Sequence, residues 1–410
     1  MKALTEKSCF IFVLAVLTLI MPSRSLGQKV ETEDGVRIVH NTDRGEWGRN
    51  SGLSLKLIRK IGDVDTLDEN LAFNFPADIA WDQDGNYYIL DSGNHRIQKF
   101  DSEGRYLATI GRQGQGPGEF NYPASIDVDR KGYIYVADPN NQKIQILTPE
   151  GKEQATIKMI EGQVGFLKLT PDDRMIMGGQ AGVLMAFSPG QEEKAELPKI
   201  FKIIDEEGKP VLEFGDPFVF EGMLVNRIGN QMNYALDDQG CVYVSYVYRN
   251  RLEKYSPDGK LEWKADRKLG YSTDPPKEKG AVSGSGGRRM IRMPQMNRCS
   301  SGIAVDSQGR IWVSTLKRQL REEEQAGMNV GLTMSGAGQR TMSMQASGNT
   351  DVRETDAYYL EVYSPEGSLL GRIQMDHFVD GLAFHGGRLF VLDRLRGTQY
   401  FEYEVQEKQR

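Results

Sequence analysis

The chain has 410 residues, of which 26% are charged and 39% hydrophobic; it carries 51 basic and 57 acidic residues, a formal net charge of −6 and three cysteines. An acidic balance excludes a globally basic nucleic-acid-binding protein. Three cysteines exclude a scaffold that is held together by several disulfides. The mean hydropathy of −0.50 excludes a polytopic membrane protein.

The first segment of the chain has the pattern of a secretory signal peptide. Lys2 and Lys7 precede an apolar run at residues 9–21, and small residues follow it. This run is too short for a bilayer-spanning helix, which needs about 20 apolar residues. We predict a signal peptide at residues 1–27 with cleavage after Gly27. The mature chain is then expected in the periplasm or outside the cell, with no integral membrane segment.

The chain contains internal repeats. Residues 78–105 and 125–152 match at an offset of 47, which brings Asp82 onto Asp129 and Gly85 onto Gly132. Four further copies are weaker, and they start near residues 166, 233, 302 and 380. A period in the forties with alternating apolar residues is typical of the blades of a β-propeller.

Each copy is punctuated by turn residues. Asp-x-x-Gly recurs at 82–85, 129–132, 237–240 and 306–309, between runs rich in β-branched and aromatic residues. The pattern predicts an all-β, six-bladed β-propeller at residues 53–405, with four antiparallel strands, A to D, in each blade. The last copy lacks a fourth strand. We therefore predict that residues 53–62 supply this strand and close the ring, and that residues 28–52 form an N-terminal extension.

Three segments resemble the NHL-repeat family of six-bladed β-propellers. They are Asp91-Ser-Gly-Asn-His-Arg-Ile-Gln98, Asp138-Pro-Asn-Asn-Gln-Lys-Ile-Gln145 and the glycine-rich link at residues 111–120. The resemblance implies a propeller of the bacterial exported type. The family includes binding modules, scaffolds and a few lyases, so the resemblance implies a fold more than an activity.

Strand order divides the loops between two faces of the disc. The A–B and C–D turns belong to one face, named here the tight-turn face, and the B–C loops and D–A links belong to the other, the loop face. Both long insertions, residues 264–299 and 316–356, fall on the loop face and are rich in Gly, Ser and Met, so we expect them to be mobile. They indicate either the working surface or tolerated padding. Cys241 and Cys299 fall on opposite faces, which predicts no disulfide between them.

The loop-face segments also collect basic residues. In a protein of net charge −6 this asymmetry predicts an anionic ligand or a protein partner rather than nucleic acid. The alternative is solvated charge paired with Glu322, Glu323 and Glu324. The basic residues are Arg112, Arg249, Arg288, Arg289, Arg292, Arg298, Lys317, Arg318, Arg321, Arg394 and Arg396.

Repeat register also predicts which side chains line the mouth of the central channel. Asp78, Asn233 and Asp380 occupy equivalent positions four residues before the A–B turn. Two carboxylates and an amide could hold Ca²⁺ or another divalent cation. Six-bladed lactonases are similar in using Glu, Asn and Asp around a central metal. The alternative interpretation is a hydrated polar channel.

These observations favour an exported, non-catalytic propeller that binds a protein or an anionic ligand through its loop face. Such a protein is expected to act as a monomer and to need no cofactor. The alternative hypothesis is a metal-dependent hydrolase or lyase with Asp78, Asn233 and Asp380 at its centre.

Overall fold

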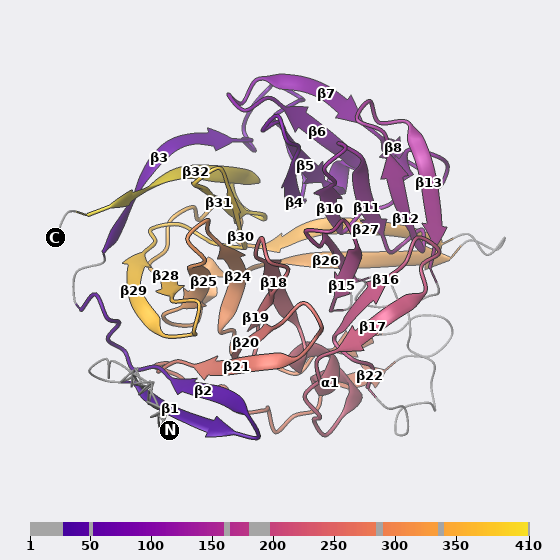
Figure 1. The fold of residues 1–410 in the computed structure, drawn as a ribbon. Helices are drawn as coiled ribbons and strands as arrows, with labels where there is room; N and C mark the ends of the chain where they lie inside the picture. Colours follow the sequence, from indigo (N-terminus) through magenta and orange to yellow (C-terminus); the bar gives the residue numbers. More distant parts are fainter. Residues whose placement is uncertain are drawn as a thin grey trace, which may run out of the picture.

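The computed structural model describes residues 28–48, 52–159, 165–179, 197–283, 290–334 and 340–408. The predicted signal peptide lies outside these residues. Six antiparallel sheets are arranged around a common axis, each with one strand near the centre and the others further out (Figure 1). The chain is thus a six-bladed β-propeller, which confirms the predicted fold. Among the described residues, no helix has the length and apolar character needed to cross a bilayer.

The four strands of each blade follow one another outward from the axis. Blade 1 contains β4 (Pro76–Trp81), β5 (Tyr87–Asp91), β6 (Arg96–Phe100) and β7 (Tyr106–Ile110); blade 2 contains β10 (Ser125–Val128), β11 (Ile134–Asp138), β12 (Lys143–Leu147) and β13 (Glu153–Lys158). Blade 3 contains β14 (Phe166–Leu169), β15 (Met175–Gly178), β16 (Phe201–Ile204) and β17 (Pro210–Phe214); blade 4 contains β18 (Met232–Leu236), β19 (Val242–Tyr246), β20 (Leu252–Tyr255) and β21 (Leu261–Asp266). Blade 5 contains β24 (Ser300–Val305), β25 (Ile311–Leu316), β28 (Tyr358–Tyr363) and β29 (Leu369–Gln374).

Blade 6 is built from both ends of the propeller sequence. Its inner strands are β30 (Gly381–His385), β31 (Arg388–Asp393) and β32 (Gln399–Glu407), and its outer strand is β3 (Leu53–Ile61). β3 pairs antiparallel with β32 along its whole length. The predicted closing strand is therefore confirmed, and closure leaves no blade with a missing outer strand.

The Asp-x-x-Gly turns have the predicted form, with an additional contact. In the first turn the backbone N–H of Gly85 donates to the carbonyl of Asp82, and Gly85 has a φ of +77°, which favours glycine. The second carboxylate oxygen of Asp82 accepts a hydrogen bond from the hydroxyl of Tyr88 at 3.0 Å. The same contact recurs in blades 2, 4 and 5, through Tyr135, Tyr243 and Trp312. The turn aspartate thus anchors strand B as well as closing the turn.

The hydrophobic core lies between adjacent blades. One cluster, for example, joins Tyr88 and Leu90 of blade 1 to Ile126, Val136 and Leu147 of blade 2. All five side chains are fully buried. Because each blade is covered by its neighbours, the ring is stable only when every blade is present. Cys241 and Cys299 are buried and free, so the structure contains no disulfide between them.

The N-terminal extension adds to blade 4 instead of lying outside the ring. β1 (Lys29–Glu33) and β2 (Val36–His40) form a hairpin, and β2 pairs in parallel with β21, so this sheet has six strands. The chain then passes blade 5, where the backbone N–H of Trp47 donates to the carbonyl of Leu370 at 2.8 Å. The extension therefore connects blades 4, 5 and 6 along the outer edge of the disc.

Candidate functional site on the loop face

The loop face brings B–C loops and D–A links together as the strand order requires. The long insertion of blade 5 reaches the link between blades 1 and 2, where the backbone N–H of Met344 donates to the Tyr122 hydroxyl at 3.3 Å. Arg396, in the B–C loop of blade 6, donates to the backbone carbonyl of Glu324 in the same insertion. The insertion thus connects distant parts of this face.

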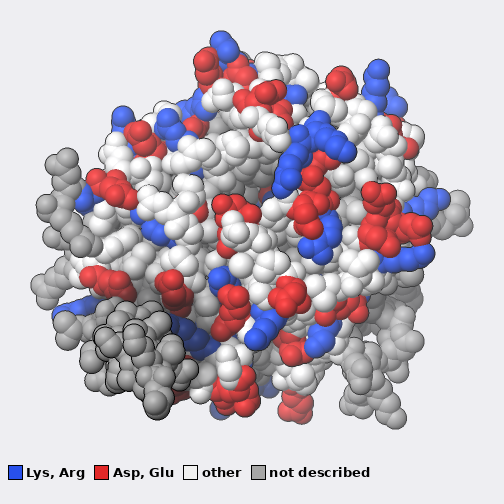
Figure 2. All heavy atoms as spheres, viewed as in Figure 1, with Lys and Arg blue, Asp and Glu red and all other residues white. Residues whose placement is uncertain are grey.

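Part of the predicted basic set forms ion pairs within the protein. Arg112 pairs with Glu119 and Arg292 with Glu278, each at 2.8 Å. Figure 2 shows acidic and basic side chains interspersed over one face of the disc. Arg288 and Arg289 lie outside the described residues. The charges of Arg112 and Arg292 are therefore matched locally by acidic neighbours.

Two further cations of the predicted set make contacts other than ion pairs. The guanidinium of Arg249 lies 4.8 Å from the ring centre of Phe218 and 5.3 Å from that of Phe220, and burial lowers its pKa. Arg394 donates to the backbone carbonyls of Pro76 and Ala77 at 3.2 and 3.3 Å. Both side chains therefore hold loops in place.

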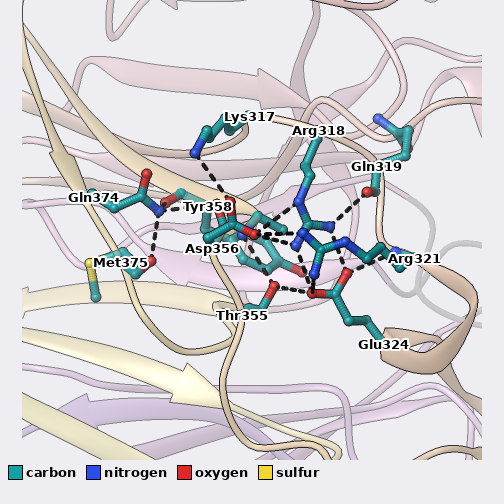
Figure 3. Close-up of polar contacts among 11 residues, drawn as sticks. Lys317, Arg318, Gln319, Arg321, Glu324, Thr355, Asp356, Tyr358, Gln374 and Met375 are labelled. Carbon is teal, nitrogen blue, oxygen red and sulfur yellow. Dashed lines mark hydrogen bonds and ion pairs between the residues drawn. The ribbon is translucent and has the colours of Figure 1, made fainter.

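A charged cluster clamps the base of the long insertion (Figure 3). Arg318 donates to both carboxylate oxygens of Glu324, at 2.6 and 2.7 Å, and to Asp356 at 3.0 Å. Lys317 also donates to Asp356, and Thr355 to Glu324. Arg318 lies near the start of the insertion, and Asp356 ends it. The cluster, named here the Arg318 clamp, therefore fixes both ends of the insertion. The alternative interpretation of paired charge is correct for these residues, although among Glu322, Glu323 and Glu324 only Glu324 belongs to the clamp.

The insertion itself folds into a hairpin of two nine-residue strands, β26 (Ala326–Met334) and β27 (Arg340–Gly348). In the view along the axis it overlaps the middle of the ring and extends past β10–β12 (Figure 1). One face of this pairing carries Met328, Val330, Met342 and Met344, and the other carries Asn329, Gly331, Ser343 and Gln345. Met328 remains 41% exposed. The link at 264–299 holds a shorter hairpin, β22 (Ala281–Ser283) with β23 (Met290–Arg292), so paired strands occupy both segments that were expected to be mobile.

The Arg318 clamp should persist in mild acid. Hydrogen bonds from Arg318 lower the pKa values of Glu324 and Asp356 to about 2. Because these folded-state pKa values lie below the unfolded ones, the stabilisation is complete above about pH 4.5 and is lost as the pH falls towards 2. We expect Arg318→Met to lower the free energy of unfolding by about 2 kcal/mol at pH 7 and at pH 5, mainly through the buried pair with Glu324.

Urea unfolding of both proteins at pH 7, 5 and 3 measures this dependence. The difference between wild type and Arg318→Met should be the same at pH 7 and 5 and smaller at pH 3. A difference that is constant over all three pH values would show that Arg318 acts through packing and not through its charge.

Several buried polar side-chain groups have no hydrogen-bond partner among the described residues, and two of them, the hydroxyl of Tyr358 and Nε of Arg396, lie on this face close to one another. The guanidinium of Arg298 is an electrostatic neighbour of Tyr358. Tyr358 is fully buried and Arg396 is 2% exposed. Arg298 and Arg396 were in the basic set predicted from the sequence, but Tyr358 was not, because it reads there as an ordinary strand residue.

The residues of the metal hypothesis are not brought together as a binding set. Lys168 Nζ lies 3.0 and 2.9 Å from the two carboxylate oxygens of Asp78. Asp380 accepts from the backbone N–H of Arg394, while Asn233 Nδ2 is buried without a hydrogen-bond partner among the described residues. In that part of the chain, no group of three or more His, Cys, Asp or Glu residues is placed to hold a metal ion. The geometry favours the alternative of a polar channel, in which the Asp78–Lys168 pair joins blades 1 and 3.

Comparison with known proteins supports the architecture. A family model described as a 6-bladed beta-propeller (DUF5128) matches residues 29–148. No curated protein matches the chain in sequence. Membership of the NHL-repeat family therefore remains a prediction from the sequence.

Solved structures of bacterial propellers are similar over nearly the whole chain. A member of the DUF4221 family from Bacteroides vulgatus is 11% identical, covers 87% of this chain and 99% of its own, and has a TM-score of 0.56. A Bacteroides fragilis protein described as a "putative exported protein" is 11% identical, covers 91% and 100%, and has a TM-score of 0.52. Virginiamycin B lyase from Staphylococcus aureus is 9% identical, covers 86% and 99%, and has a TM-score of 0.44. The first two likenesses show the fold alone: this chain is a six-bladed β-propeller.

Proposed function

We propose that the protein is an exported, non-catalytic binding module that holds a protein partner on its loop face. The observation that carries this proposal is the β26–β27 hairpin. It is fixed at its base by the Arg318 clamp and contacts Tyr122 on the far side of the disc, yet its apolar row includes the exposed Met328. A two-stranded sheet with one apolar face and two unpaired edges offers both side-chain and backbone contacts to another chain.

Export is supported by two independent features. Lys2, Lys7 and the apolar run at residues 9–21 have the pattern of a signal peptide. A similar fold also occurs in the Bacteroides fragilis protein described as exported. A partner for this chain is accordingly sought in the periplasmic or extracellular fraction, and the mass of the recovered chain would report cleavage after Gly27.

Removing the hairpin while keeping its base tests the proposed surface. The backbone N–H of Asn349 already donates to the carbonyl of Gln325 at 2.9 Å, so an Asn-Gly turn can replace residues 326–348 without disturbing Arg318, Glu324 or Asp356. We expect this variant to fold with an unchanged thermal midpoint and to lose at least 90% of the partner captured by the wild type from the exported fraction. Quantitative mass spectrometry of the captured proteins measures the loss.

A matched change on the tight-turn face is the control. Arg130 and Gln239 line a pocket of about 350 Å³ between the turns of blades 2, 3 and 4. The double variant Arg130→Ala and Gln239→Ala should capture the partner as the wild type does. Undiminished capture by the hairpin variant, or a selective loss in the tight-turn variant, would move the binding surface away from the loop face.

A further inference from the structure

The two unpaired donors of Tyr358 and Arg396 lie together with Arg298 between blades 5 and 6. The ring of Tyr358 packs edge-on against Phe378, with 6.2 Å between ring centres, and the guanidinium carbon of Arg396 lies 3.4 Å from the centre of the same Phe378 ring. One aromatic side chain therefore positions both the Tyr358 hydroxyl and Arg396. Glu324 also contacts Arg396. Its backbone carbonyl accepts a hydrogen bond from one terminal nitrogen of the Arg396 guanidinium.

Backbone pairing brings Arg298 to the same place. The N–H of Leu316 donates to the carbonyl of Cys299 at 3.0 Å, and Leu316 is also paired across the sheet with Tyr358. Arg298 directly precedes Cys299, so it lies next to a residue that is hydrogen-bonded to the strand partner of Tyr358. It is partly exposed, whereas Tyr358 and Arg396 are buried. Arg298 is thus the most exposed of the three side chains.

Two carboxylates are close by, but both are already engaged by backbone amides. Asp380 accepts from the N–H of Arg394 at 3.0 Å. Asp393 accepts from the N–H of Arg396 at 3.1 Å and from that of Gly397 at 2.8 Å. Neither lies within hydrogen-bond distance of the Arg298 guanidinium or the Tyr358 hydroxyl. The acids moderate the positive charge of the site without occupying its donors.

Buried donors without acceptors are costly, so the neighbouring Tyr358 hydroxyl and Nε of Arg396 require a reason. Two guanidinium groups and a phenol offer directed N–H and O–H bonds, which suit a planar carboxylate that can accept from two sides. We propose that Arg298, Tyr358 and Arg396 form a binding site for a carboxylate group. The site deepens the proposed function, because a protein partner presents such groups as acidic side chains or as its C-terminus.

Thermal unfolding in the presence of succinate tests the site directly. Succinate carries carboxylates, and succinamide has the same size without charge. At ionic strength matched with sodium chloride, we expect succinate to raise the unfolding midpoint of the full-length mature chain with a saturable concentration dependence, and succinamide to have no effect. Arg298→Met should weaken the apparent affinity for succinate at least tenfold. Arg112→Met removes the same charge from the same face, in the link between blades 1 and 2, and should behave as the wild type.

Tyr358→Phe separates a binding role from a structural one. Its hydroxyl has no hydrogen-bond partner in the part of the chain that the structure describes, so the unliganded variant should be as stable as the wild type or slightly more so. Succinate should nevertheless bind this variant at least threefold more weakly. The proposal is overturned if succinate and succinamide act alike, if Arg112→Met and Arg298→Met weaken succinate binding equally, or if Tyr358→Phe leaves it unchanged. Because the capture experiment depends on the hairpin and not on succinate, loss of this site would leave the proposed function standing, and the reverse also holds.

Discussion

A chain that starts at Asp63 should fail to form a stable monomeric propeller. The deletion removes β3, which is the outer strand of blade 6 and pairs with β32 over residues 53–61. Leu53 and Ile61 are 2% and 3% exposed, and losing the burial of two such side chains costs about 3–6 kcal/mol. This approaches the whole stability of a typical domain, about 5–15 kcal/mol. It also leaves the edge of β32 free to pair with another chain.

Returning the missing strand at the other end of the chain should restore the fold. The backbone N–H of Lys408 donates to the carbonyl of Gly52 at 3.0 Å, so a two-residue turn can join Lys408 to Gly52. The permuted chain would begin at Asp63 and end at Gly62. We expect it to be monomeric by size-exclusion chromatography and to unfold in urea within about 1 kcal/mol of a chain that starts at Gly52, which contains the same strands, since the pairing of β3 with β32 is retained.

A shorter truncation is the control for this experiment. A chain that starts at Gly52 loses β1, β2 and Trp47 but keeps β3, so it should remain a monomer with reduced stability. If the chain that starts at Asp63 is as stable as this control, closure by β3 is not what holds the ring together. Failure of the permuted chain to fold would instead show that folding depends on the position of β3 at the start of the chain.

Repeating local signals explain why the propeller could be predicted from the sequence. Each blade needs a turn with a carboxylate at its first position and Gly at its last, and Asp82-x-x-Gly85 and its counterparts have this chemistry regardless of what surrounds them. The start of the weak third copy near Phe166 could be predicted because apolar alternation persists there after its Asp-x-x-Gly turn is lost. The aspartate–aromatic contact was missed, although its constant spacing of six residues, as in Asp82 and Tyr88, is visible in the sequence.

Contacts between distant segments explain what could not be predicted. The hairpin of β1 and β2 pairs with β21, more than 220 residues away, and nothing in residues 29–40 distinguishes blade 4 from the other five outer edges. The charge pairing on the loop face could not be predicted for the same reason. A run of basic residues on one face predicts an anionic ligand only if their acidic partners are far away, and Arg318 meets Glu324 and Asp356 through the folding of the insertion. The unpaired donors became visible only once these pairs were known.

Asp306→Ala should be among the most destabilising single substitutions in the turns. The carboxylate of Asp306 accepts from the backbone N–H groups of Gln308 and Arg310, from Nε of Arg310 at 2.7 Å and from Nε1 of Trp312 at 2.9 Å. Trp312 is fully buried, so its indole N–H would lose its partner without gaining water. We expect the free energy of unfolding, measured in urea, to fall by about 3–5 kcal/mol.

Asp205→Ala is a matched control, because it removes the same side chain from another Asp-x-x-Gly turn on the same face. Among the described residues, the Asp205 carboxylate accepts only from the backbone N–H groups of Glu207 and Lys209, and no aromatic side chain donates to its second oxygen. Its loss should cost about 1 kcal/mol, the usual value for a turn or cap hydrogen bond to the backbone. The difference between the two variants therefore isolates the bonds to Arg310 and Trp312. Equal destabilisation would mean that the aspartate supports only the turn, and that anchoring of strand B by its carboxylate contributes nothing measurable.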